Sequence, residues 1–291
     1  MMNMVRRRKP TQAAIQGNPT LHPRAFELVR ERFPDLEWHF YAQSPDSSQA
    51  FALSAFLPLI EFTDRDLLLD QFVARALPGV PPGGERVWRV LPEYSDATLL
   101  GESGYGDSTA VDVLLVAHDV VVCVECKFRA DARRGWGKCS QPPRLCDGFH
   151  GVGSDRKGTA AACRLDIADG HRGPRHYWRV ARQHFRDEVF AAQHAGDICP
   201  LLGEYQLVRN YLFAARYAET TGRPHFGMIG VAPAARSQPL ASGVERFKRQ
   251  VLAPHAASRV ACTTWEEYLT VLSHGSPPAR ELADFLRSRL S

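Results

Sequence analysis

The chain has 291 residues, of which 44% are hydrophobic and 23% are charged, and its formal net charge is +4. These values describe an ordinary globular protein long enough to bury a large core, and they argue against a disordered or fibrous one. We find no apolar run near the length of a transmembrane helix. The basic residues at 6–9 are followed by no apolar segment, and seven cysteines without a secretory signal are typical of a reducing compartment, so we expect a cytoplasmic protein with no membrane partner.

The first third of the chain is mainly helical in pattern. Apolar spacing predicts helices over residues 23–32, 49–62 and 66–77, with the second interrupted by Pro58. The cluster Pro81-Pro82-Gly83-Gly84 then forms a turn, and residues 86–94 alternate as a strand does.

Two nearly continuous apolar runs follow, at residues 111–116 and 120–128, and both read as strands buried on two faces. Asp112 in the first run, and Glu125 and Lys127 in the second, are costly there unless something compensates their charge. Glu125 and Lys127 are two residues apart and therefore point to the same side of the strand. A hairpin would bring Asp112 beside them. This pattern predicts a site for a hard divalent cation and a phosphate at the end of a sheet.

Residues 129–198 form a predicted insertion. Over 129–175 it is rich in Gly, Arg, Pro and Cys with little periodicity, and a helical pattern returns at 176–192. The net charge of Lys and Arg against Asp and Glu is −6 over residues 1–126 but +9 over 127–186. A basic segment beside a candidate cation site fits nucleic acid, and we expect DNA; the alternative is a solvated loop with an excess of arginine.

The rest of the chain alternates helices and strands. Helices are predicted at 201–218, 244–251, 264–272 and 279–290, and strands at 226–231 and 259–262. The two charged strands should pair antiparallel, whereas the strand at 226–231 follows a helical crossover. We therefore expect an α/β fold with a mixed sheet.

The charged strands carry a resemblance. Asp112, followed after twelve residues by Glu125-Cys126-Lys127 at the end of an apolar strand, resembles the PD-(D/E)XK nuclease superfamily. Val111 stands where the motif has proline. The order of elements from about residue 60 to 231 fits that family's core. Tyr205-Gln206-Leu207 with Tyr211 is similar to the helix of the recombination nucleases, with a spacing one residue off.

The resemblance implies a restriction-endonuclease-like fold, in which helices flank a mixed central sheet in three layers. It implies a single nuclease-like domain over residues 1–291, with the insertion at 129–198. The activity it implies is hydrolysis of phosphodiester bonds by a Mg²⁺-dependent or Mn²⁺-dependent nuclease, in restriction, defence or repair.

The same resemblance assigns roles at the site. Asp112, Glu125 and the backbone carbonyl of Cys126 would supply the oxygen ligands that Mg²⁺ prefers. Lys127 would lie beside the attacking water and orient it, lower its pKa or stabilise the charged phosphorus centre. The alternative is a buried Glu–Lys pair with no metal.

Further residues are candidates for the same site. A further acid is usual in this family, and we favour Glu102, whose flanking glycines permit close approach, over Glu93 at the end of the preceding strand. Gln206 is predicted to face the site from the following helix; otherwise it is a surface glutamine.

The insertion and its end hold a second candidate metal site, made of Cys139, Cys146, Cys163 and Cys199. These cysteines suit Zn²⁺, or an iron–sulfur cluster such as some relatives carry. They include no Cys-x-x-Cys pair, so free thiols are the alternative. Cys123 and Cys126 read as core residues.

Two other functions stay open at this point. One is a catalytically silent module of the same fold that binds nucleic acid or a partner, and the other is a zinc or iron–sulfur sensor built on the insertion. The pattern leaves open DNA against RNA, the mode of cleavage, the sequence specificity and the oligomeric state, for which a homodimer is compatible.

Overall fold

The computed structural model describes residues 10–83, 85–102, 108–129, 135–137, 166–167, 175–191 and 203–290. Its α-helices are α1 (Gln12–Gln16), α2 (Pro23–Arg32), α3 (Ser48–Phe56), α4 (Arg65–Ala76), α6 (Tyr177–Ala181), α7 (Asp187–Ala191), α8 (Tyr205–Thr221), α9 (Ala234–Gln250), α10 (Trp265–Ser273) and α11 (Pro277–Leu290). Short 3₁₀ helices are η1 (Pro58–Glu61) and η4 (Pro254–Arg259). The strands are β1 (Arg89–Ser95), β2 (Ala110–Val116), β3 (Val120–Cys126), β4 (Asp166–Ile167), β5 (Arg175–His176), β6 (His225–Ala232) and β7 (Val260–Thr264).

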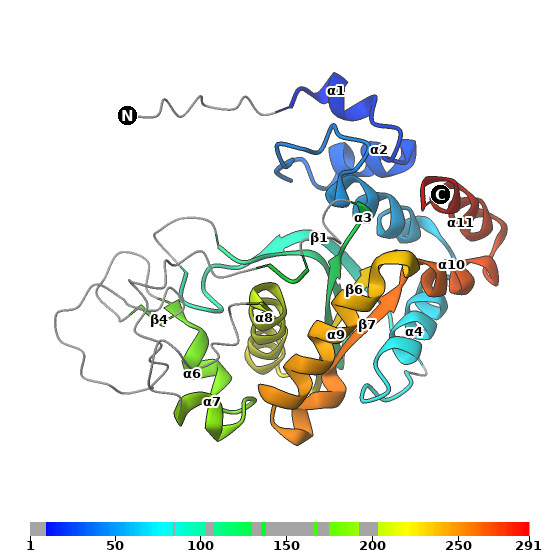
Figure 1. The fold of residues 1–291 in the computed structure, drawn as a ribbon. Helices are drawn as coiled ribbons and strands as arrows, with labels where there is room; N and C mark the ends of the chain where they lie inside the picture. Colours follow the sequence, from blue (N-terminus) through cyan, green and yellow to red (C-terminus); the bar gives the residue numbers. More distant parts are fainter. Residues whose placement is uncertain are drawn as a thin grey trace, which may run out of the picture.

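The central element is a five-stranded mixed sheet in the order β1-β2-β3-β6-β7 (Figure 1). β1, β2 and β3 pair antiparallel, whereas β3, β6 and β7 pair in parallel. The two charged runs form the antiparallel hairpin β2–β3, and α8 is the crossover that leads to the parallel strand β6. The predicted α/β class and the mixed sheet are therefore confirmed.

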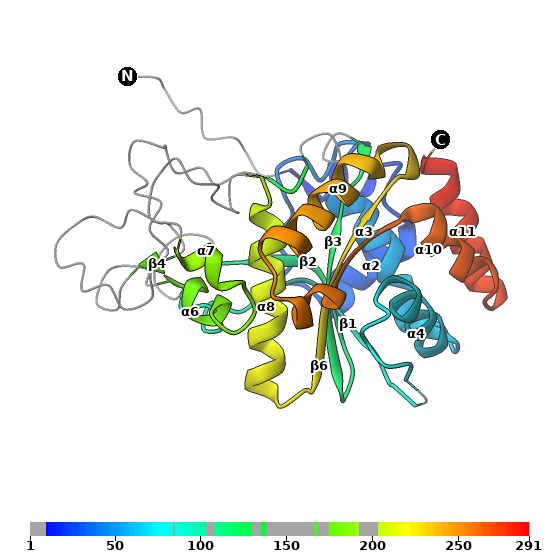
Figure 2. The same cartoon turned by 60° about the horizontal axis from the view of Figure 1, so that its bottom comes forward.

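Helices cover both faces of the sheet, which explains why its strands are apolar on both sides. α8 and α9 pack on one face, where their buried residues include Tyr211, Phe213 and Phe247. α3, α4 and α10 pack on the other, where Phe56 and Trp265 are among the buried residues, and α11 packs against α10 and α3. Figure 2 shows the sheet between α8 and the group formed by α3, α4 and α10. The result is three layers of helix, sheet and helix.

Two predicted helices differ from the observed ones. The pattern at 176–192 forms two short helices, α6 and α7, because the chain turns at 182–184 and then pairs with a distant segment: Phe185 bridges to Leu252, and Arg186 N–H donates to the Val251 carbonyl. α9 begins ten residues before the predicted start, at Ala234. Its polar first turns and Pro239 hide the helix in the sequence, whereas Leu240, Val244 and Phe247 bury one stripe against α8 and the sheet.

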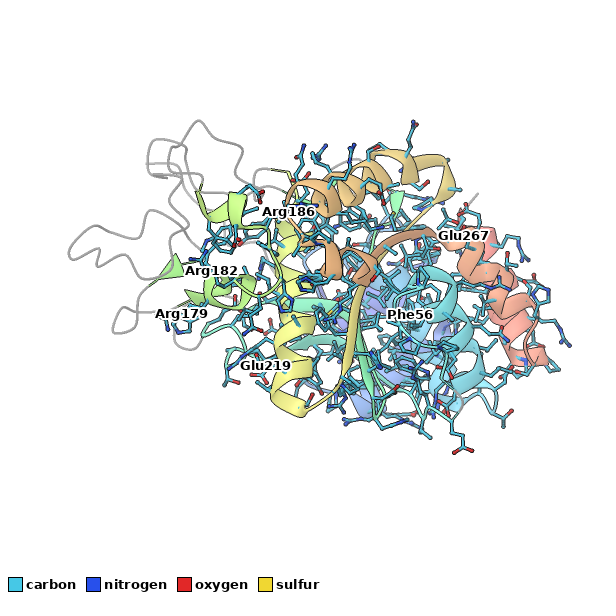
Figure 3. All side chains as sticks on the ribbon, turned by 90° about the horizontal axis from the view of Figure 1, so that it is seen from below. Phe56, Arg179, Arg182, Arg186, Glu219 and Glu267 are labelled. Carbon is cyan, nitrogen blue, oxygen red and sulfur yellow. The ribbon has the colours of Figure 1, made fainter. Side chains whose placement is uncertain are left out.

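The predicted insertion at 129–198 is described only at 129, 135–137, 166–167 and 175–191. Within it, Arg179, Arg182 and Arg186 lie on the side of the molecule that carries α8, away from Phe56 and Glu267 (Figure 3). The part of the chain that the structure describes contains no helix long and apolar enough to cross a membrane.

Candidate active site

Three carboxylates stand in a row across the first three strands of the sheet. Val113 pairs with Val124, which places Asp112 opposite Glu125. On the other side of β2, the pairs Pro92–Val113 and Tyr94–Val111 place Glu93 opposite Asp112. Residues opposite one another on neighbouring strands share a face of the sheet. This face is the one covered by α8.

Glu125 is 4% exposed and holds three hydrogen bonds. Its Oε1 accepts from Lys127 Nζ and from the amide of Gln206, both at 2.8 Å. Its Oε2 accepts from the Asn210 amide at 2.6 Å. A buried carboxylate is costly unless it is paired in this way. Its partners are therefore part of the site and not incidental neighbours.

Lys127 follows the last residue of β3 and is also buried. Its backbone N–H donates to the Val231 carbonyl of β6 at 2.8 Å, and its carbonyl accepts from the Trp265 indole at 2.9 Å. With the backbone held on both sides, the Lys127 ammonium donates to Glu125 and, at 2.7 Å, to the side-chain oxygen Oε1 of Gln206. The ammonium lies 5.9 Å from the centre of the Trp136 ring. The amine is thus fixed beside the carboxylates.

Asp112 completes the group on the neighbouring strand. Its Oδ2 accepts from the Cys126 N–H at 2.7 Å. Burial raises the pKa of this carboxyl well above its usual value, and the charges of Glu125 and Glu93 raise the pKa further, against a lowering by Lys127. The carboxylates therefore repel one another, and a bound cation would relieve that repulsion.

The start of α8 is anchored so that two amides face Glu125. The Gln206 N–H donates to the Trp136 carbonyl at 2.8 Å, and the buried Glu204 accepts from Arg246 Nε of α9 at 2.6 Å. Asn210 lies four residues after Gln206 and so on the same side of the helix. The sequence analysis found Gln206 but missed Asn210; the i, i+4 spacing was the signal that would have identified it.

Glu93 has two features that suit a ligand-binding carboxylate. Its backbone has a positive φ of 45°, which non-glycine residues rarely adopt. Its Oε1 is buried and has no hydrogen-bond partner among the described residues, while Oε2 lies 3.4 Å from His39 Nε2. An oxygen left without a donor beside Asp112 fits a cation.

Glu102, the acid that the sequence analysis favoured, lies elsewhere. Its buried carboxylate accepts from the Thr109 N–H at 2.6 Å and from the Thr109 hydroxyl at 3.1 Å, and also from the Tyr177 hydroxyl. Like Glu93, it is not among the described residues that line the pocket beside Asp112, but Glu93 is opposite Asp112 on the next strand. A role for Glu102 at the metal stays a prediction.

A pocket of about 420 Å³ opens onto two of the acids, Asp112 and Glu125. Asp112, Glu125, Cys126 and Lys127 line its sheet side, and α8 contributes Tyr205, Gln206 and Arg209; His39, Ser48, Gly135 and Gly137 complete the lining. Tyr211, in contrast, is buried in the core beside His184 and Phe226. The pocket therefore makes the acids, the amine and one arginine accessible together.

The predicted metal ligands divide into two groups. Cys139, Cys146, Cys163 and Cys199 lie outside the described residues, so their site stays a prediction. Cys123 and Cys126 are buried in the core, as expected. Within the described ranges, no three His, Cys, Asp or Glu side chains converge closely enough to hold a metal by themselves. Mg²⁺ commonly binds through one or two carboxylates with water, so Asp112, Glu125 and the Cys126 carbonyl fit that ion.

The chain was compared with known proteins. A family model described as "Restriction Endonuclease associating with ARP" matches residues 7–289, nearly the whole chain. No curated protein and no solved structure matches it.

Proposed function

The chain belongs to the family of restriction endonucleases associating with ARP, and from this premise we propose that it is a Mg²⁺-dependent nuclease of the PD-(D/E)XK type, acting on DNA. The observation that carries the proposal is the meeting of Asp112, Glu125 and Lys127 in one pocket. Lys127 Nζ lies 2.8 Å from Glu125, and Asp112 is opposite Glu125 on the next strand.

Asp112, Glu125 and the Cys126 carbonyl would hold the cation, and Glu93 offers a further oxygen. Two observations favour this set: burial, with the charges of Glu125 and Glu93, raises the pKa of Asp112, and Glu93 Oε1 has no hydrogen-bond partner among the described residues. When bound, the cation supplies positive charge that polarises the phosphate and activates water.

The protein's own side chains position the reacting groups. The Lys127 ammonium donates a hydrogen bond to Glu125. In the substrate complex it would also donate to an oxygen bound next to Glu125, which is that of the attacking water or of the phosphate. Gln206 and Asn210 keep Glu125 in one orientation. Ordering these donors before the substrate arrives lowers the cost of reaching the transition state.

The family description also names an association with ARP. We therefore propose a protein partner in addition to nucleic acid, in restriction or defence. The catalytically silent module remains the second candidate, because Lys127 and Glu125 already neutralise one another as a buried pair.

Cleavage of plasmid and of single-stranded DNA, in Mg²⁺, Mn²⁺ or EDTA, tests the proposal. Wild-type protein should cleave only with the metal, and Asp112→Ala should lose cleavage. Arg280→Ala is the control, since this exposed side chain on α11 donates one hydrogen bond among the described residues, to the Gly275 carbonyl of the adjoining turn. DNA binding without metal-dependent cleavage, unchanged by Asp112→Ala, would instead support the silent module.

A further inference from the structure

Arg209 is the second cation of the pocket, on the helix wall that faces the acids. It follows Gln206 by three residues on α8 and lines the same cavity. Its Nε and Nη2 donate to the Thr109 hydroxyl at 3.1 and 2.8 Å, and Nε lies 3.4 Å from the Tyr177 hydroxyl. The Tyr205 ring lies 5.1 Å from the guanidinium carbon. One edge of the guanidinium is therefore fixed against the protein.

Glu102 stands behind this edge. The distance from its Oε1 to Arg209 Nη2 is 3.9 Å, which is too long for a hydrogen bond. Thr109 and Tyr177 already satisfy the Glu102 carboxylate. Arg209 nevertheless lies near this fully buried carboxylate, and the negative charge attracts and orients the guanidinium. Glu102 therefore helps to hold the arginine at the pocket wall.

The remaining edge of the guanidinium is available to a ligand. Arg209 Nη1 makes no hydrogen bond to any described residue, and its side chain is 23% exposed. Arginine keeps its charge at all physiological pH values and binds phosphate oxygens in a fork. A side chain held in place before binding also loses little conformational entropy on binding.

The charges on the sheet side of the pocket favour a positive group on its other wall. Among the described residues, Asp112, Glu125 and Lys127 are the charged side chains on the sheet side of the pocket, Lys127 is paired with Glu125, and Glu93 is opposite Asp112 on β1. A polyanion that enters this pocket meets net negative charge wherever no metal neutralises it. Arg209 supplies a positive group on the opposite wall that does not depend on a metal.

We propose that Arg209 binds a backbone phosphate of the substrate next to the scissile one, and that Glu102, Thr109 and Tyr177 are positioning residues for its guanidinium. This proposal rests on the nuclease function proposed above and adds a phosphate subsite to it. It also gives Glu102 a role different from that of a metal ligand.

Binding of fluorescently labelled DNA, measured by anisotropy with Ca²⁺ in place of Mg²⁺, tests the subsite. The duplex and the single strand of one sequence are compared, and the tighter is used. Arg209→Ala should weaken binding about tenfold and reduce the salt slope by about 0.9 for a duplex, or about 0.7 for a single strand. Arg216→Ala is the matched control, because Arg216 is exposed on the same helix and its ion pair among the described residues is with Glu219.

A series of oligonucleotides, each with one neutral methylphosphonate, locates the contact. Wild-type protein should lose affinity when the phosphate next to the cleaved bond is neutral, and Arg209→Ala should be insensitive there. Arg209→Lys, which keeps the charge without the fork, should retain a reduced sensitivity and covers the case in which the alanine variant does not fold.

The positioning residues have their own readout. Glu102→Gln and Tyr177→Phe should raise KM with little change in kcat and in the Mg²⁺ requirement, whereas loss of a metal ligand would lower kcat and shift the Mg²⁺ requirement.

If wild-type protein binds DNA and Arg209→Ala binds equally well with the same methylphosphonate profile, the subsite is overturned while the nuclease function stands. If wild-type protein neither binds nor cleaves nucleic acid, both proposals fail.

Discussion

Asn210 donates its side-chain amide to Oε2 of Glu125 at 2.6 Å, from a helix to a strand 85 residues earlier in the chain. The other carboxylate oxygen has two donors, Lys127 and Gln206. Oε2 therefore depends on Asn210 alone among the described residues. Together with the Gln206 contact, the Asn210 contact ties α8 to the end of β3 and holds the carboxylate for a cation.

Asn210→Leu should consequently destabilise the protein by about 1–3 kcal/mol, because it leaves a buried acceptor without a donor. Urea denaturation in EDTA measures the change. Gln206→Leu is the comparison: Glu125 Oε1 keeps Lys127 as a donor, so the loss should be smaller. Equal costs for the two variants would show that Asn210 does not hold the carboxylate.

Trp136 fills the space that Gly230 leaves on β6. A Cβ at position 230 would lie 2.0 Å from the Trp136 ring, so Gly230→Ala forces the ring to move. We expect the free energy of unfolding to fall by about 1–3 kcal/mol. Cleavage should also be slower, because the Trp136 carbonyl accepts a hydrogen bond from the Gln206 N–H at the start of α8. Thermal denaturation and a cleavage assay measure both effects.

Two further variants check this packing. Gly17→Ala should be nearly neutral, because the nearest atom to its Cβ would be 3.6 Å away. Combining Gly230→Ala with Trp136→Phe should cost less than the sum of the single changes, since the smaller ring leaves room for the methyl group. Strict additivity would rule out the clash as the cause.

The raised pKa of Asp112 predicts a specific pH dependence. Burial and the charges of Glu125 and Glu93 disfavour its ionised form in the folded state. Stability is therefore lost as the pH rises from the ordinary carboxyl value of 3.8 through the higher folded value. In EDTA, Asp112→Asn should be more stable than wild type at neutral pH, and the difference should vanish below the ordinary value. Added Mg²⁺ should narrow the difference.

Asp119 supplies a control of opposite sign. Its hydrogen bonds with Arg86, at 2.8 Å, lower its pKa from 3.8. The stability it contributes is present above the ordinary carboxyl value and is lost as the pH falls through the lower folded value. Asp119→Asn should thus destabilise at neutral pH. Denaturation curves across pH compare the two variants, and a shift of the same sign in both would contradict this reading of Asp112.

The charged strands were predictable because their chemistry is local. Strand alternation puts Glu125 and Lys127 on one side, and a hairpin brings Asp112 to the neighbouring strand, as the structure has it. The apolar runs also indicated the buried sheet, since strands covered on both faces read as nearly continuous apolar runs.

The rest of the site depends on tertiary contacts. The sequence did not show whether Glu102 or Glu93 lies closer to Asp112. That depends on two tertiary features, the hydrogen bond from Tyr177 of α6 to Glu102 and the positive φ of Glu93. Arg209 was overlooked since an arginine on a helix surface is common, and only the fold brings Thr109 to it. Trp136 fits only because Gly230 and Gly243 come together around it.

The most direct test of the nuclease is the single-turnover rate of DNA cleavage in Mg²⁺ for wild type, Lys127→Met and Lys248→Met. Lys248 is a matched lysine on α9, paired with Glu245 and remote from the pocket lining. Wild type and Lys248→Met should cleave at equal rates, EDTA should stop both, and Lys127→Met should be slower by about 10²–10³-fold. Cleavage by Lys127→Met at the wild-type rate, or cleavage that persists in EDTA, would contradict the proposed nuclease function.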